Sequence, residues 1–224
     1  MKGDERARQE YLSKREQLKP KEFWRDIDAW PLYVGRKNLR RNIFLLTCLE
    51  RVMCVPGDLA EFGAWRGATT SLMAKYLADD PHGKEKLVHI FESFSGFDVT
   101  VQADKDLRSG YKGDAEELLA QLDLDGVVSA VAFHVGDICE TVLDVECELS
   151  FVLIDCDVYA PSIAALRWAH NKLHPGGLIL FDEYNDPAWK GETEAANEFL
   201  AEFGDEYDQE GTPVSQPSLL LVKK

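Results

Sequence analysis

The sequence lacks the signatures of several large protein classes. Its five cysteines are odd in number and include no C-x-x-C pair, which argues against both a disulfide framework and a zinc knuckle. No apolar run reaches the roughly 20 residues of a membrane-spanning helix, and the charged residues 1–6 provide no apolar core for a signal peptide. We therefore expect a cytoplasmic protein that is not inserted in a membrane.

Positive charge is also scarce. The chain has 25 lysines and arginines against 40 aspartates and glutamates, which gives a formal net charge of -15. A protein of this charge repels phosphate backbones and anionic lipid head groups. We therefore expect small molecules and proteins as partners, and neither nucleic acid nor a membrane.

The length of 224 residues, 45% of them hydrophobic, is enough for one sizeable core. We expect residues 36–224 to form a single domain and residues 1–35 to form an N-terminal helical extension. Residues 4–21 are rich in charge and form either a disordered tail or a helix that packs on a partner subunit or over the site. Aromatic residues crowd positions 23–33, where they either cover the core or line a substrate entrance.

Short apolar runs alternate with helical patterns along the rest of the chain, which predicts an α/β fold with a mostly parallel sheet covered on both faces. The last two runs have no helix between them, so we expect them to pair antiparallel at one edge. The loop 95–113 is long enough to suggest a lid over the site. The expected strands are 58–62, 87–91, 131–135, 151–154, 178–181, 206–209 and 218–222, and the expected helices are 36–53, 68–77, 115–121, 161–172 and 192–203.

Two pairs of acidic residues follow two of the expected strands. Asp155 and Asp157 come after the strand 151–154, and Asp182 and Glu183 come after the strand 178–181. The carboxyl ends of neighbouring parallel strands meet at one crevice, where acids face a ligand rather than bulk water. Three or four converging carboxylate oxygens can hold a divalent cation.

A glycine turn follows the first strand. Gly63 and Gly67 form a G-x-x-x-G spacing, where the absence of side chains lets the backbone approach a ligand near a helix N-terminus. The G-x-G-x-x-G pattern of nicotinamide dinucleotide sites is absent. A tight structural turn is the alternative to a binding role.

Acids also stand at the ends of the first three strands. Glu61, Glu92 and Asp137 occupy these positions in chain order. An acid after the second strand can accept hydrogen bonds from ribose hydroxyls, and Asp137 could meet an adenine amino group. Each acid alone is better explained as a solvated cap than as a ligand contact, but the series of three favours a nucleoside-containing ligand.

The order of these motifs resembles the class I S-adenosylmethionine-dependent methyltransferases. It resembles most closely the macrocin (TylF-type) O-methyltransferases, which act on sugars of macrolide antibiotics. The resemblance extends from about residue 36 to residue 203. It is carried by Glu-x-Gly-x-x-x-Gly at 61–67, Glu-Ser-Phe-Ser-Gly at 92–96, Ile-Asp-Cys-Asp-Val-Tyr at 154–159, Pro-Gly-Gly at 175–177 and Asp-Glu-Tyr at 182–184.

The resemblance implies a Rossmann-like fold with an antiparallel last strand, the cofactor S-adenosyl-L-methionine, Mg²⁺, and a hydroxylated small-molecule acceptor such as a natural-product sugar. It also suggests a homodimer or a larger assembly. Glu92 and Glu183 each replace an Asp of the family pattern, which keeps the charge and lengthens the reach. The implied metal ligands are Asp155, Asp182 and Glu183, and the implied cofactor contacts are Glu61, Gly63, Gly67, Glu92, Ser93, Asp137 and Asp155.

Methyl transfer to a sugar hydroxyl requires activation, because a neutral hydroxyl is a poor nucleophile. A hard cation on the acceptor oxygen lowers the pKa of that hydroxyl and fixes its direction. Asp155 or Asp157 could then take the proton, and we favour Asp155 as the catalytic base because its side chain should point toward the crevice. Asp157 has a helix cap as its alternative role. Two other functions remain open from the residues: a nicotinamide-dependent reductase and a non-catalytic ligand-binding homologue.

Overall fold

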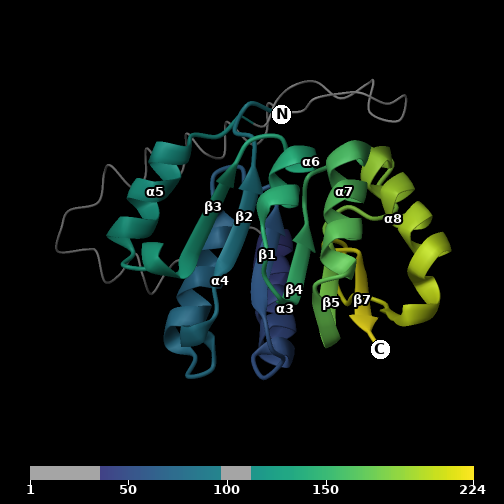
Figure 1. The fold of residues 1–224 in the computed structure, drawn as a ribbon, viewed down its shortest axis with the longest axis horizontal. Helices are drawn as coiled ribbons and strands as arrows, with labels where there is room; N and C mark the ends of the chain where they lie inside the picture. Colours follow the sequence, from purple (N-terminus) through teal and green to yellow (C-terminus); the bar gives the residue numbers. More distant parts are fainter. Residues whose placement is uncertain (1–35, 97–111) are drawn as a thin grey trace.

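The computed structural model describes residues 36–96 and 112–224. The expectations for the N-terminal extension 1–35 and for most of the loop 95–113 lie outside these residues. The described part contains one seven-stranded sheet in the order β3-β2-β1-β4-β5-β7-β6, with helices on both faces (Figure 1). Its strands are β1 (Asp58–Phe62), β2 (Val88–Glu92), β3 (Val131–Val135), β4 (Leu149–Ile154), β5 (Leu173–Phe181), β6 (Tyr207–Glu210) and β7 (Leu219–Lys223).

Six α-helices and four short 3-10 helices connect the strands in the described residues. Among these described helices, none is both long enough and apolar enough to cross a membrane. The α-helices are α3 (Arg36–Val52), α4 (Ala68–Asp79), α5 (Ala115–Leu124), α6 (Ile138–Thr141), α7 (Tyr159–His170) and α8 (Lys190–Phe203), and the 3-10 helices are η2 (Gly83–Glu85), η4 (Val128–Ala130), η5 (Val142–Asp144) and η6 (Gly204–Glu206).

The sheet separates two hydrophobic cores. Along β4, Phe151 and Leu153 pack with helices α3, α4 and α5, whereas Val152 and Ile154 pack with α6, α7 and α8. Successive side chains of a strand point to opposite faces, so a strand buried on both sides must be apolar at every position. All six residues of β4 are buried, although Ser150 is polar. This explains why its sequence is a continuous rather than an alternating apolar run.

The strand directions confirm the predicted sheet. Strands β1 to β5 are mutually parallel, and β7 lies antiparallel between β5 and β6. Strand β5 begins at Leu173 rather than at residue 178, because the residues 174–177, which resemble a turn, continue the strand with two exposed positions. The short helix α6 was not predicted, since four residues are too few for a helical period.

Candidate active site

The register of the sheet brings the acid-bearing segments together. Phe62 on β1 pairs with Ile154 on β4, and Ile154 pairs with Phe181 on β5. The ladder continues one residue further, since the Asp155 N–H donates to the Phe62 carbonyl at 2.9 Å and the Asp182 N–H donates to the Ile154 carbonyl at 3.0 Å. The residues that follow β1, β4 and β5 therefore meet at one edge of the sheet.

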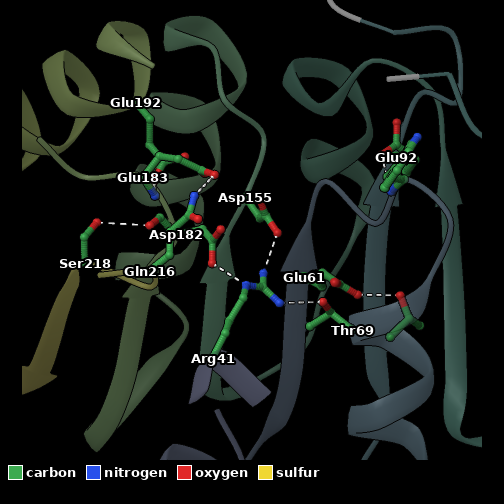
Figure 2. Close-up of polar contacts among 12 residues, drawn as sticks. Arg41, Glu61, Thr69, Glu92, Asp155, Asp182, Glu183, Glu192, Gln216 and Ser218 are labelled. Atoms are coloured by element: carbon green, nitrogen blue, oxygen red, sulfur yellow. Dashed lines mark hydrogen bonds and ion pairs between the residues drawn. The ribbon is translucent and has the colours of Figure 1, made fainter. Parts of the chain in front are cut away.

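Arg41 of helix α3 bridges two of these acids (Figure 2). Its Nε donates to Asp182 Oδ1 at 2.7 Å, its Nη2 donates to Asp155 Oδ2 at 2.8 Å, and its Nη1 donates to Thr69 Oγ1 at 3.0 Å. Burial alone would lower the pKa of Arg41, but Asp182 and Asp155 raise it above its ordinary value. The guanidinium group therefore stays charged and neutralises part of the charge of this edge.

Three carboxylates form a tighter group beside Arg41. Asp155, Asp157 and Glu183 each offer an oxygen, and these three oxygens lie within 4.8 Å of one another. Asp157 has a φ of 66°, a left-handed conformation that Asp tolerates better than most residues. The group shares Asp155 and Glu183 with the ligand set expected from the sequence. It contains Asp157 in place of Asp182. Arg41 pairs with Asp182 outside this group and with Asp155 inside it.

Glu183 and Glu192 complete the acid cluster with two unpaired oxygens. Glu183 Oε1 accepts a hydrogen bond from Gln216 Nε2, and Glu192 Oε1 accepts from the Glu183 backbone N–H at 3.1 Å. The second oxygen of each side chain is buried and has no hydrogen-bond partner. The sequence motifs pointed to neither Glu192 nor Gln216.

Burial makes this cluster hard to ionise without a cation. Burial, assisted by neighbouring carboxylates, raises the pKa of Asp157 to about 8 and that of Glu183 to about 12. The pKa values of Asp155 and Glu192 also lie well above the ordinary range, mainly because of burial. Hard carboxylate oxygens of this kind are the ligands that Mg²⁺ prefers, so both the donor set and the unpaired oxygens fit a divalent cation.

The glycine turn owes its sequence to close backbone packing. Gly63 has a φ of 94°, and a Cβ added there would lie 2.0 Å from the Asp155 carbonyl oxygen. Gly67 has a φ of 74° and precedes α4, and a Cβ there would lie 2.0 Å from Leu118 Cδ1. Gly63 is thus required by the main chain of Asp155 and Gly67 is favoured by its left-handed backbone, whether or not a ligand also approaches them.

Glu92 connects the glycine turn to the segment after β2. Its Oε2 accepts from the Trp65 N–H at 2.9 Å, and its Oε1 accepts from the Phe94 N–H at 2.9 Å. The Ser93 hydroxyl, which has a single hydrogen to donate, lies 3.4 Å from Glu92 Oε1 and 3.3 Å from the Gly96 carbonyl oxygen. Glu92 and Ser93 therefore shape the loops at the end of β2.

The remaining predicted cofactor residues have different surroundings. Glu61 is 1% exposed and accepts a hydrogen bond from Thr70 Oγ1 at 2.5 Å, and burial raises its pKa to about 7. Asp137 caps helix α6 by accepting from the Cys139 N–H at 2.9 Å. Asp137 thus has the capping role that the sequence left open, and it follows β3, two strands away from β1.

Comparison with known proteins adds a family and two named relatives. The family model described as Macrocin-O-methyltransferase (TylF) matches residues 6–206. The chain is 27% identical over 200 residues to the 8-demethyl-8-(2,3-dimethoxy-alpha-L-rhamnosyl)-tetracenomycin-C 4'-O-methyltransferase of Streptomyces olivaceus, covering 79% of this chain and 75% of that protein. It is 27% identical over 192 residues to the mycinamicin III 3''-O-methyltransferase of Micromonospora griseorubida, covering 76% and 70%.

Solved structures share the fold. The calicheamicin methyltransferase CalS11 aligns with a TM-score of 0.75 at 22% identity, over 96% of this chain and 90% of that chain. The O-methyltransferase NovP aligns with a TM-score of 0.73 at 22% identity, over 83% and 80%. These likenesses confirm the class I methyltransferase fold that the sequence motifs implied.

Proposed function

Because the chain belongs to the macrocin O-methyltransferase (TylF) family, we propose that it transfers a methyl group from S-adenosylmethionine to a sugar hydroxyl of a small natural product. Family membership makes the chain an S-adenosylmethionine-dependent O-methyltransferase and decides against the nicotinamide-dependent reductase. The sugar acceptor is supported by the relative from Streptomyces olivaceus, whose name includes a rhamnosyl group, and the relative from Micromonospora griseorubida is named as an O-methyltransferase of mycinamicin III. A homodimer or larger assembly stays a prediction.

The observation that carries the proposal is the group of carboxylates at the ends of β4 and β5. We propose that Asp155 and Glu183 hold Mg²⁺, with Asp157 or Asp182 as the third ligand. Asp157 is favoured because one of its oxygens lies within 4.8 Å of oxygens of Asp155 and Glu183, and Asp182 is favoured by the family pattern. A bound Mg²⁺ supplies a Lewis acid that lowers the pKa of an acceptor hydroxyl.

The protein groups then accept a proton and orient the acceptor. The hydroxyl oxygen attacks the methyl carbon of the sulfonium, its proton passes to a carboxylate, and S-adenosylhomocysteine leaves. We propose Asp155 as the base because it stands at the end of β4, while Arg41 holds Asp155 Oδ2 in place. Asp157 is the second candidate, since one of its carboxylate oxygens belongs to the same close group as those of Asp155 and Glu183.

The cofactor is proposed to lie over the ends of β1, β2 and β3. Gly63, Gly67, Glu92 and Ser93 border this region, and Glu61, Asp137 and Asp155 are the other proposed contacts. The main support is Glu92, which stands where an acid can accept hydrogen bonds from both ribose hydroxyls. Its carboxylate is already held by the Trp65 and Phe94 N–H groups, so it is fixed in direction before any ligand binds.

Two variants separate the proposed cofactor and cation sites. Glu183→Gln should weaken Mg²⁺ binding by about tenfold or more and abolish turnover, while the affinity for S-adenosylhomocysteine stays nearly unchanged. Glu92→Ala should instead reduce the affinity for S-adenosylhomocysteine. Titration calorimetry measures both affinities, and Glu194→Gln on the exposed side of α8 is the matched control. Loss of S-adenosylhomocysteine binding in Glu183→Gln, with Mg²⁺ binding intact, would show that the two sites are assigned incorrectly.

A further inference from the structure

Glu192 is a buried acid that none of the sequence motifs includes. It lies in the first turn of α8 and is 0% exposed. Figure 2 shows its side chain next to Glu183, on the side of the acid cluster away from Arg41. Charged side chains are almost never fully buried unless they are paired, so the presence of an acid here requires an explanation.

One hydrogen bond ties Glu192 to the segment that follows β5. Glu192 Oε1 accepts from the Glu183 N–H at 3.1 Å, and Asp157, which follows β4, is close enough to influence the Glu192 carboxyl group electrostatically. The side chain of Glu192 therefore fixes the main chain directly after β5. A glutamine oxygen could accept the same hydrogen bond, so this contact explains the length and the acceptor of the side chain but not its negative charge.

The negative charge of Glu192 is explained if the neighbouring acid cluster binds a cation. Glu192 Oε2 and Glu183 Oε2 are both buried without a partner, while the guanidinium of Arg41 is engaged by Asp155 and Asp182. A buried ionised carboxylate is strongly unfavourable unless a positive charge compensates it. A divalent cation held by Asp155 and Glu183 would provide that compensation.

We infer that Glu192 is a positioning residue of the cation site. It orients Glu183 through the main-chain N–H of that residue, and its negative charge increases the affinity of the site for a divalent cation. This inference rests on the cation in the proposed function. It adds a residue outside the proposed ligand set, one that acts on the cation through Glu183.

The test uses Mg²⁺, and Mn²⁺ as a second probe, titrated into the full chain by calorimetry. Glu192→Gln retains the oxygen acceptor, so the melting temperature without metal should stay equal to or above that of the wild type. The same variant should bind Mg²⁺ about tenfold or more weakly, the usual cost of losing an outer partner of a metal ligand. Glu192→Ala should bind Mg²⁺ more weakly than Glu192→Gln and should also have a lower melting temperature, because the Glu183 backbone N–H loses its acceptor.

The possible contrary results are distinct. If Glu192→Gln binds Mg²⁺ as tightly as the wild type and as the exposed control Glu194→Gln, Glu192 serves only as a backbone acceptor and the inference is wrong. If the wild type itself binds neither Mg²⁺ nor Mn²⁺ but still transfers methyl groups in the presence of a chelator, the metal part of the proposed function fails and this inference fails with it.

Discussion

At the scale of single residues, Arg41 is the counter-ion of two carboxylates from different strands. Its side chain is 16% exposed, and those of Asp155 and Asp182 are 23% and 6% exposed. Removing one partner of a buried ion pair leaves an uncompensated charge and costs about 3–5 kcal/mol. Arg41→Met should therefore lower the free energy of unfolding by about this amount, measured by urea denaturation in the presence of EDTA.

The control for this prediction lies on the same helix. Arg51 pairs with Glu210 at 2.8 Å, but the two side chains are 39% and 43% exposed. An exposed pair of this kind contributes about 0–1 kcal/mol, so Arg51→Met should have little effect. Equal destabilisation by the two substitutions would mean that Arg41 contributes through helix α3 rather than through the acids.

The candidate site was only partly predictable from the sequence, because sequence patterns show strand ends but not the partners that reach them. Asp155 and Glu183 could be found, since each closely follows an apolar run. Arg41 could not, because 114 residues separate it from Asp155 and its helix carries other arginines with no distinguishing spacing. Glu192 could not be found either, because its position in the sequence gives no more signal than that of any other polar residue near the start of a helix.

At the scale of elements, the junction between β1 and β4 depends on Gly63. A left-handed conformation alone costs a residue with a Cβ about 1–2 kcal/mol, and the Asp155 carbonyl oxygen stands 2.0 Å from the position of that Cβ. Gly63→Ala should therefore destabilise the chain by more than about 2 kcal/mol. It should also weaken Mg²⁺ binding, because the main chain of Asp155 must move.

A second glycine provides the comparison. A Cβ added at Gly211 would meet no heavy atom within 4 Å, and the φ of Gly211 lies outside the left-handed range. Gly211→Ala should therefore leave both the unfolding curve and the calorimetric titration unchanged. If Gly63→Ala also left the unfolding curve and the Mg²⁺ titration unchanged, the close approach of β1 and β4 would not constrain the site.

The elements themselves were largely predictable, because a sheet buried on both faces leaves a strong apolar signal. Strands β1 and β3 have the predicted bounds, and β6 and β7 are shifted by one residue. Helix α7 begins at Tyr159, two residues before Pro161, since proline is tolerated in the first turn of a helix. Strand β5 was predicted too short because its first half is partly exposed and contains proline and glycine.

At the scale of the whole molecule, the buried acids make stability depend on pH. Burial raises the pKa of Glu61 to about 7 and that of Asp157 to about 8, whereas both groups titrate near pH 4 in an unfolded chain. Between these limits the folded chain binds more protons than the unfolded chain, so the free energy of unfolding falls as the pH rises. The melting temperature in EDTA should therefore decrease steadily from about pH 5 to about pH 8.

Saturating Mg²⁺ should reduce this decrease, because a cation stabilises the ionised carboxylates of the folded state. Glu61→Gln should also reduce it, by removing one of the groups that gain protons on folding. Differential scanning calorimetry at matched ionic strength measures the melting temperature against pH for three samples. These are the wild type in EDTA, the wild type in saturating Mg²⁺ and Glu61→Gln in EDTA. A melting temperature that rises over this range in EDTA would contradict the assignment of these acids as protonated in the metal-free fold.

The segment between β6 and β7 also reaches the acid cluster. Gln216 donates to Glu183 Oε1, and the Ser218 hydroxyl donates to the Asp182 carbonyl at 3.0 Å. Both residues follow the last position matched by the family model, residue 206. The C-terminal segment therefore supports Glu183 from outside the parallel strands, so a substitution at Gln216 would alter the proposed cation site while leaving every strand in place.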